Sequence, residues 1–404
     1  MAASERRAAE ARALVRALDG WTLLAATAAP AETRGGRLVL GRGALRRLTE
    51  RIRGCREATA VFLDVERLDK PTQRELEAAW AVPVLDRFAL VLHIFRRRAR
   101  SREARLQVAL AELPLLRSRL DSDAARAPGR GSGSRYILGS GESFTQMQRR
   151  LFREREMKIE KALERLRAKR RLLGGQRARR ELPVVSVVGY TNCGKTTLVK
   201  ALTGDADMQP RDQLFATLDV TAHAGALPCG LTVVYVDTVG FLSQLPHSLI
   251  AAFSATLEDV AQSDLIVHVR DVSHPESELQ KATVLSTLRD LRLPAPLLAS
   301  LLEVHNKADR VPGYTPREPH AVAVSALQGH GLPELKARLE DAVLKATGRR
   351  ALTLRVQLEG QQLSWLHEEA AVQEVRVLPE AGAAEVTVVI SGSAYGRFRK
   401  LFPE

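Results

Sequence analysis

A glycine-rich segment that follows a short apolar run constrains the fold of this chain more than any other feature. Residues 184–188 read Val-Val-Ser-Val-Val and predict a buried strand, and Gly189-Tyr-Thr-Asn-Cys-Gly194-Lys195-Thr196 follows directly. A helix is expected to begin near Thr197. The pattern GxxxxGK[ST] between a strand and a helix is a P-loop, so the sequence predicts an α/β domain that cradles phosphate groups.

The residue types in this segment suit a phosphate ligand. Glycine lets consecutive backbone N–H groups point at phosphate oxygens, and the start of the next helix adds a favourable dipole. Lys195 is expected to place its charge on the β- and γ-phosphates, and the Thr196 hydroxyl to bind Mg²⁺. The segment therefore predicts a nucleoside triphosphate as the ligand and Mg²⁺ as a cofactor.

Four further motifs follow the P-loop in a fixed order, at 212–219, 237–240, 306–309 and 325–327. The last two address the base: a carboxylate at Asp309 can accept both N1–H and the 2-amino group of guanine, which adenine lacks. Asn-Lys-x-Asp alone is also a common surface turn, and Asp-Thr-Val-Gly alone is a plausible strand end. Five motifs in order over about 140 residues predict a GTP-binding domain.

Each motif supplies candidate site residues. Lys195, Thr217 and Gly240 are expected to serve the reaction, and Thr196, Thr217 and Asp237 to hold Mg²⁺. The full set expected to bind GTP is Gly189, Tyr190, Thr191, Asn192, Cys193, Gly194, Lys195, Thr196, Thr197, Phe215, Ala216, Thr217, Asp237, Gly240, Asn306, Lys307, Asp309, Ser325, Ala326 and Leu327.

The basic charge lies almost entirely before the P-loop. Residues 1–182 contain 41 Lys and Arg against 22 Asp and Glu, whereas residues 183–348 contain 13 against 18. A basic region of this size favours a polyanion such as nucleic acid, with an anionic membrane surface or a merely solvated helix as alternatives. Because aromatic residues make up only 4% of the chain, backbone and shape contacts to folded RNA are favoured over base stacking.

Four regions are expected along the chain. Residues 1–100 are assigned to a small α/β subdomain. Within them, residues 20–100 alternate apolar runs, interpreted as strands at 21–27, 37–40, 60–65 and 88–95, with helices at 44–53 and 72–79. Residues 101–180 are expected to form an antiparallel helical hairpin. The GTP-binding domain is assigned to 183–348. A small α+β domain is assigned to 349–404, with strands at 352–358, 372–378 and 385–390 and helices at 361–370 and 394–401.

The second helix of the hairpin is predicted from its apolar periodicity. This helix, 142–180, carries an apolar seam at Ile159, Leu163, Leu166 and Leu173, and it contains 14 Lys and Arg against 5 Asp and Glu. The hairpin could be a packing arm or a probe that inserts a basic loop into RNA. For the second alternative, the candidate RNA-binding residues are Arg126, Arg130, Arg135, Arg149 and Arg150.

The motifs together resemble the HflX family of ribosome-associated GTPases. The resemblance is carried by 189–197, 212–219, Asp237-Thr-Val-Gly-Phe-Leu-Ser-Gln-Leu-Pro-His247 and Ala255-Thr-Leu-Glu-Asp-Val260. Upstream it is carried by Asp86-Arg-Phe, His93-Ile-Phe and Glu103-Ala-Arg-Leu-Gln-Val-Ala-Leu110, so it covers most of residues 20–345. It implies an N-terminal α/β subdomain, a helical hairpin, a GTPase domain and a small C-terminal domain.

The resemblance also implies a function and a location. It implies binding to the large ribosomal subunit and its rRNA, and separation of ribosomal subunits. The vertebrate mitochondrial branch of the family is the most similar, which implies the mitochondrial matrix; the cytoplasm is the alternative if a targeting region is truly missing. A monomer is expected. The rival functions are a GTP-switched assembly scaffold with incidental hydrolysis and a membrane-signalling G protein, which the absence of a lipidation motif disfavours.

Two positions depart from the patterns of better-known GTPases. Phe241 stands directly after Asp237-Thr-Val-Gly240, where Ras-like GTPases have a glutamine that orients the attacking water. Phenylalanine cannot bind a water, so another group must complete the site, unless Phe241 simply packs. Asn192 resembles the P-loop asparagine of potassium-activated GTPases, which makes K⁺ a possible second cofactor. The hairpin loop at 135–143 also differs from the bacterial glycine-rich form.

Several classes of protein are excluded or disfavoured. The longest nearly apolar run, 88–95, is much shorter than the roughly 20 residues of a membrane-spanning helix. Cys55, Cys193 and Cys229 are far apart and odd in number, so neither a disulfide framework nor a metal site is expected. Residues 1–18 contain Glu5 and Glu10, which disfavours a transit peptide.

Overall fold

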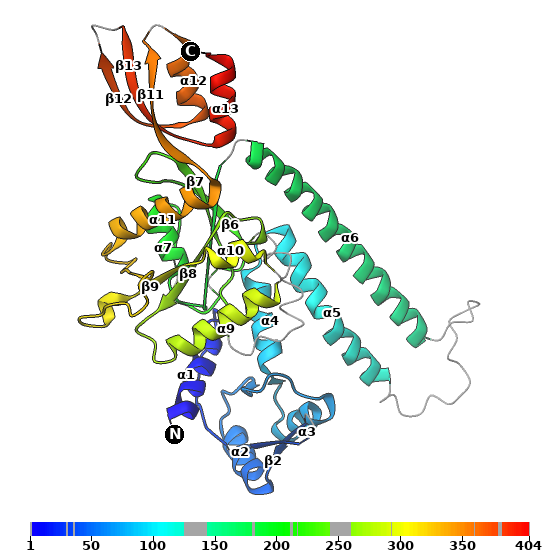
Figure 1. The fold of residues 1–404 in the computed structure, drawn as a ribbon. Helices are drawn as coiled ribbons and strands as arrows, with labels where there is room; N and C mark the ends of the chain where they lie inside the picture. Colours follow the sequence, from blue (N-terminus) through cyan, green and yellow to red (C-terminus); the bar gives the residue numbers. More distant parts are fainter. Residues whose placement is uncertain are drawn as a thin grey trace. The chain divides into compact units, whose positions relative to one another are not determined.

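The computed structural model describes residues 2–29, 31–34, 37–124, 144–179, 182–210, 213–215, 217–242, 260–291, 293–358, 360–378 and 382–403. The chain forms two units (Figure 1). The first comprises Met1–Arg171, Gln213–Asp219 and Gln244–Phe253, and the second comprises Leu172–Asp212, Val220–Ser243 and Ser254–Glu404.

The first unit begins with mixed α/β structure, as expected. Its helices are α1 (Ala2–Arg16), α2 (Arg42–Gly54), α3 (Lys70–Trp80) and α4 (Arg87–Arg98). Strands β1 (Ala31–Arg34) and β2 (Arg37–Leu40) pair antiparallel, and the short strands β3 (Val61–Phe62) and β4 (Val84–Leu85) pair parallel. Helix α1 packs through buried Leu14 and Val15, so this segment is a structural element of the first unit.

Two strand predictions in this region are wrong, and a third is too long. The run 88–95 forms helix α4, whose first turn is capped because the Asp86 carboxylate accepts a hydrogen bond from the backbone N–H of Ala89 at 2.7 Å. This helix is buried on nearly all sides, so it has no polar face to reveal a helical period. Residues 21–27 are irregular, and the strand expected at 60–65 is limited to Val61–Phe62.

A helical hairpin follows, and it confirms the predicted seam at Ile159 and Leu163. Helix α5 (Arg102–Ala124) and helix α6 (Phe144–Arg179) run in opposite directions (Figure 1). Buried Ile159 and Leu163 of α6 pack with buried Leu113 of α5. Around them lie the partly buried Leu106, Ala109, Leu110 and Phe152.

The second unit contains a six-stranded sheet with the order β10-β9-β8-β5-β7-β6. Its strands are β5 (Val184–Gly189), β6 (Thr221–Ala226), β7 (Thr232–Asp237), β8 (Leu265–Asp271), β9 (Leu302–Asn306) and β10 (Val322–Ala323). Only β6 pairs antiparallel to its neighbour. The carboxyl ends of β5, β7, β8 and β9 therefore meet at one edge, which is where ligands bind in open parallel sheets.

Helices cover this sheet on both faces. Helices α7 (Lys195–Thr203) and α11 (Leu332–Thr347) share one apolar cluster with Val185, Val187, Val267, Val269 and Val304, all fully buried. Helix α9 (Ser277–Asp290) contacts β8 and β5. A short helix α10 (Ala295–Ala299) and the 3₁₀ turn η1 (Ala308–Arg310) complete the domain. Continuous burial of β5 and β8 is why both strands read as unbroken apolar runs.

The last part of the second unit is the small α+β fold that the sequence predicts. Strands β11 (Arg350–Gln357), β12 (Ala371–Leu378) and β13 (Ala383–Ile390) form an antiparallel sheet with the order β11-β13-β12. Helices α12 (Gln361–Glu369) and α13 (Gly392–Leu401) cover one face of the sheet (Figure 1). The side chain of Trp365 packs on Phe398 with ring centroids 5.5 Å apart, which supports a structural role for this tryptophan.

Across the described ranges, no helix has the length and apolarity to cross a membrane.

Candidate guanine-nucleotide site

The predicted P-loop connects β5 to α7 and has the backbone that such a loop needs. Gly194 has φ +95°, and a Cβ atom there would lie 2.3 Å from Nδ2 of Asn306, so no other residue fits. Asn192 also has a positive φ, +61°, which asparagine tolerates better than most residues. The loop therefore bends back tightly at the start of α7, where backbone N–H groups are available to an anion.

Lys195 and Gly240 meet at this loop. The Lys195 ammonium donates hydrogen bonds to the backbone oxygens of Gly189, at 3.3 Å, and Tyr190, at 3.1 Å. A Cβ atom on Gly240 would lie 3.0 Å from Lys195 Nζ and 2.6 Å from the Cα atom of Thr191. The backbone of Gly240 thus lies directly beside the lysine charge, as a γ-phosphate contact from both residues requires.

Thr196 and Asp237 provide the oxygen atoms that fit a magnesium ion. The Thr196 hydroxyl, in the first turn of α7, donates a hydrogen bond to Asp237 Oδ2 at 2.6 Å, and Asp237 ends β7 with no exposed surface. A hydroxyl and a carboxylate are hard oxygen ligands, which Mg²⁺ prefers. The two residues therefore fit a magnesium ion.

The segment Asn306–Asp309, here called the guanine motif, is joined to the P-loop by hydrogen bonds. Asn306 Nδ2 donates to the backbone oxygen of Cys193 at 2.9 Å, and its Oδ1 accepts from the backbone N–H of Ala326 at 3.0 Å. Lys307 Nζ donates to the backbone oxygen of Asn192 at 2.8 Å and pairs with Asp271 at 2.7 Å. One amide and one ammonium group therefore hold together the phosphate loop, the end of β8 and the loop at 325–327.

The remaining base-contact candidates lie on the same edge of the sheet. Asp309 is exposed within η1, as a carboxylate that reads a ligand must be. Ser325 is buried, and its hydroxyl accepts a hydrogen bond from the backbone N–H of Gln328 at 3.2 Å. The Leu327 side chain is 79% exposed. Thr197 is half-buried in the first turn of α7.

The candidate switch residues near Thr217 belong to the first unit, apart from Ala216, which lies outside the described residues. Phe215 is buried and packs edge-to-face on Phe95 of α4, with ring centroids 4.8 Å apart. Thr217 is half-buried. That Thr217 closes on Mg²⁺ therefore stays a prediction.

Phe241 is buried, in agreement with the packing alternative. Only 6% of its surface is exposed, its backbone N–H donates to the oxygen of Gly189 at 3.1 Å, and its oxygen accepts from Thr191 N–H at 2.6 Å. The backbone of Phe241 thus joins the chain after Gly240 to the P-loop, while the Phe241 side chain offers no group that could orient water.

Of the five arginines proposed to contact RNA, Arg149 and Arg150 are exposed on α6. The other three, Arg126, Arg130 and Arg135, lie outside the described residues, as does His247. All three cysteines are free thiols, and burial raises the pKa of Cys193, so its thiol stays protonated.

Sequence reasoning missed a buried polar group behind the guanine motif. Arg270 on β8 and Glu303 and His305 on β9 are brought together by strand register, and the loop after η1 adds Tyr314 and Glu318. Charged residues inside otherwise apolar strands were the available signal, because a charge is buried only with partners.

Known proteins share this arrangement of segments. Family profiles described as "GTP-binding GTPase N-terminal", "GTP-binding GTPase Middle Region" and "50S ribosome-binding GTPase" match residues 5–96, 98–180 and 184–307. GTP-binding protein 6 of Homo sapiens is 68% identical over 403 residues, covering 100% of this chain and 78% of the relative. GTPase HflX of Magnetococcus marinus is 41% identical over 311 residues, covering 75% of this chain and 70% of the relative.

A solved structure of a GTP-binding protein from Sulfolobus solfataricus in complex with GDP aligns with 84% of this chain and 96% of its own, at 22% identity and a TM-score of 0.46. Both sequence relatives are well over 30% identical to this chain, and the matched region covers more than two thirds of the length of each relative. This chain therefore belongs to the HflX family of GTP-binding proteins, and it is a P-loop enzyme that hydrolyses GTP.

Proposed function

We propose that this GTPase is a Mg²⁺-dependent switch that binds the large ribosomal subunit and promotes dissociation of ribosomes and maturation of that subunit. The observation that carries the ribosomal part is the charge on helix α6. Its apolar side packs on α5, and its other sides expose a long row of cations: Arg149, Arg150, Arg153, Arg155, Lys158, Lys161, Arg165 and Lys169.

Such a row suits an RNA backbone. Cations on successive turns of a straight helix follow a line of phosphates, and binding releases the counterions condensed on the nucleic acid. The exposed acids among them, Glu156, Glu160 and Glu164, are fewer than the cations. The description "50S ribosome-binding GTPase", which belongs to a profile matched by residues 184–307, supports rRNA of the large subunit as the partner.

The nucleotide roles are proposed residue by residue. Lys195 and the backbone of Gly240 neutralise and hold the γ-phosphate, while Thr196 and Asp237, joined by Thr217, hold Mg²⁺. When bound, the ion neutralises phosphate charge. Asn306 positions the P-loop, and Asp309 with the loop at 325–327 reads guanine.

Completion of the catalytic site is proposed to come from outside the chain. Because Phe241 is buried and apolar, the ribosome supplies or orders the group that positions the attacking water. We expect GTP hydrolysis to rise sharply when large subunits are added. Equal rates with and without subunits would contradict this part of the proposal.

A potassium ion beside Asn192 is a second, independent route to charge neutralisation. Asn192 is exposed with φ +61°, at the turn of the P-loop. Hydrolysis rates compared in KCl and NaCl at equal ionic strength test this idea, and identical rates would rule out a role for K⁺.

The proposed setting is the mitochondrial matrix, in which the chain acts as a monomer; the cytoplasm is the alternative. GTP binding would favour the subunit-bound state, and hydrolysis would permit release. The alternative function is an assembly scaffold that GTP merely orders. A Lys195→Ala variant that still supports large-subunit maturation would favour the scaffold.

Cosedimentation tests the ribosomal proposal. The chain is spun with large subunits, small subunits or intact ribosomes, in a non-hydrolysable GTP analogue or in GDP. We expect it to pellet with large subunits in the analogue, and the double variant Arg149→Glu/Arg150→Glu to pellet several-fold less. The matched control is Arg399→Glu/Lys400→Glu, an exposed basic pair on α13. A chain that stays in the supernatant with either nucleotide would refute the proposal.

A further inference from the structure

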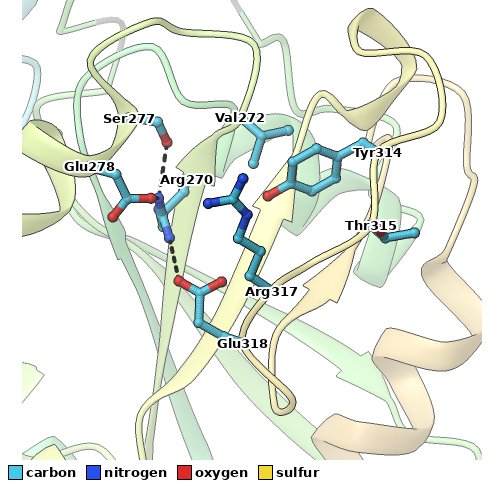
Figure 2. A pocket seen from close by; sticks show the side chains of 8 residues that line it. All are labelled: Arg270, Val272, Ser277, Glu278, Tyr314, Thr315, Arg317 and Glu318. Carbon is cyan, nitrogen blue, oxygen red and sulfur yellow. Dashed lines mark hydrogen bonds and ion pairs between the residues drawn. The ribbon is translucent and has the colours of Figure 1, made fainter.

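A buried guanidinium lies behind the guanine motif, next to a cavity of about 250 Å³ (Figure 2). Arg270 is 5% exposed and is the next-to-last residue of β8. Its neighbour Asp271 points to the ligand edge, where it pairs with Lys307. Because successive side chains of a strand alternate, Arg270 points to the opposite face of the sheet.

Arg270 joins three segments of the domain on that face. Its Nη1 donates to Glu303 of β9 and, at 3.3 Å, to Glu318 of the following loop. Its Nη2 donates to Glu278 and, at 3.3 Å, to the hydroxyl of Ser277, both in the first turn of α9. Figure 2 shows the guanidinium between Ser277, Glu278 and Glu318. The planar fork of an arginine can serve several acceptors at once, which a lysine cannot.

Lys281 of α9 adds a second cation to the same carboxylates. Its ammonium lies 2.8 Å from Glu303 and 3.1 Å from Glu318. Although burial raises the pKa of Glu303, hydrogen bonds from His305, Lys281 and Arg270 together lower it below the ordinary value. Glu303 therefore remains ionised within the network.

His305 connects this network to the guanine motif. It lies opposite Arg270 in the strand register, is 1% exposed and directly precedes Asn306. Its Nε2 lies 2.9 Å from Glu303 Oε1, and its Nδ1 lies 2.7 Å from the Tyr314 hydroxyl. A neutral imidazole protonated on Nε2 donates to Glu303 and accepts from the Tyr314 hydroxyl. Nη1 of Arg270 lies 3.2 Å from the same Nε2, and with this tautomer it donates to the carboxylates of Glu303 and Glu318 and not to the ring.

The network thus holds the guanine motif at both ends. His305 fixes the strand where the motif begins, and Tyr314 and Glu318 fix the loop by which the chain leaves it. Asp309 lies between these two anchors, in η1. An exposed carboxylate that must meet two donors on one base needs a fixed backbone, since small displacements of a reading group lose its selectivity.

We infer that Arg270, His305, Tyr314 and Glu318 are positioning residues that set guanine selectivity by fixing the loop that carries Asp309. The inference rests on the proposed role of Asp309 and deepens it. None of the four needs to touch the nucleotide.

A divalent-cation site is the competing interpretation of the same cluster. Glu303, His305 and Glu318 place ligand atoms within 4.8 Å of one another. However, Arg270 and Lys281 already hold both carboxylates, so an ion would have to displace two cations or be repelled by them. The geometry favours an ion-pair network.

The test compares affinities for GDP and inosine diphosphate, which lacks the 2-amino group. In the unaltered chain we expect GDP to bind more tightly. Tyr314→Phe/Glu318→Gln removes both anchors of the outgoing loop while leaving Arg270 with Glu303 and Glu278. We expect it to reduce the ratio of the two dissociation constants about fivefold. Arg317→Gln, an exposed residue beside the same cavity, is the matched control and should keep the ratio.

The ratio of the two dissociation constants distinguishes a positioning role from a loss of stability, because partial unfolding weakens the binding of GDP and of inosine diphosphate equally. Tyr314→Phe alone, the milder change, should reduce the ratio in the same direction. A ratio unchanged in both variants overturns the inference. If the unaltered chain does not distinguish the two ligands, the assignment of Asp309 under the proposed function fails instead.

Discussion

The carboxylate of Asp219 accepts hydrogen bonds from both the hydroxyl and the backbone N–H of Ser101, the latter at 3.2 Å. It also accepts from the N–H of Arg100 at 2.9 Å. The Ser101 hydroxyl in turn accepts from the N–H of Ala104 at 3.1 Å, so it caps helix α5. The end of the segment that carries Thr217 is therefore attached to the start of the hairpin.

Removal of this carboxylate should loosen the first turn of α5. Asp219→Ala leaves the N–H groups of Arg100 and Ser101 without this acceptor, at a cost of about 1 kcal/mol. Hydrogen exchange of residues 100–105 should become faster. Asp207→Ala, which removes another exposed carboxylate of the chain, is the control. Unchanged exchange in 100–105 would mean that the contact contributes nothing to local stability.

The same contact should transmit the nucleotide state. If Thr217 binds Mg²⁺ with GTP, Asp219 lies only two residues away. We therefore expect exchange of residues 100–105 to differ between GDP and a GTP analogue in the unaltered chain, and not in Asp219→Ala. A nucleotide-dependent difference that survives in the variant would assign the coupling to another contact.

Hydrolysis should depend on Lys195 and on magnesium. Lys195→Ala removes the ammonium that lies on the backbone oxygens of Gly189 and Tyr190, and the rate should fall on the order of 100-fold or more. Chelation of Mg²⁺ should abolish turnover, and Thr196→Ala should raise the Mg²⁺ concentration needed for half-maximal rate. Arg338→Ala, an exposed cation on α11, should leave the rate unchanged.

The hairpin should depend on Leu163, which is 4% exposed where α6 packs on α5. Leu163→Ala leaves a cavity and should cost about 2–4 kcal/mol in the first unit. Faster hydrogen exchange across α5 and α6 is the measurement. Met157→Ala, on the same helix but 59% exposed, is the control and should cost little. Equal effects of the two variants would contradict the observed packing.

Stability of the second unit should fall in mild acid because of His268. Burial lowers its pKa to about 4, whereas an unfolded histidine titrates near 6.5. Below pH 6.5 this histidine is protonated in the unfolded chain but stays neutral in the folded chain. The contribution of neutral His268 to stability is therefore fully present above pH 6.5 and is lost as the pH falls towards 4. This residue alone should remove about 2 kcal/mol between pH 7 and pH 5.

Calorimetric unfolding at pH 7 and pH 5 measures this loss. His268→Leu should reduce the difference in the free energy of unfolding between pH 7 and pH 5, even if it changes stability at both pH values. His330→Gln, which removes an exposed histidine, should leave the difference as it is. An acid-induced loss of equal size in His268→Leu would show that other groups cause it.

Local sequence was sufficient to predict the structure where a functional motif or a helical period constrains neighbouring residues. The P-loop, Asp237–Gly240 and Asn306–Asp309 follow strands as predicted, because each motif needs a strand end to present it. The apolar seam of α6 at Ile159 and Leu163 could also be predicted, because the other face of that helix is exposed to solvent and carries polar residues.

Tertiary structure decided what no local pattern encodes. Helix α4 was predicted as a strand, because burial on nearly all sides removes the polar face that would distinguish the two periods. The meeting of Arg270 with His305 depends on the register of β8 against β9, and that of Asp219 with Ser101 joins residues 118 positions apart. Such contacts are fixed by the packing of whole elements, so the sequence names the groups but only the fold brings them together.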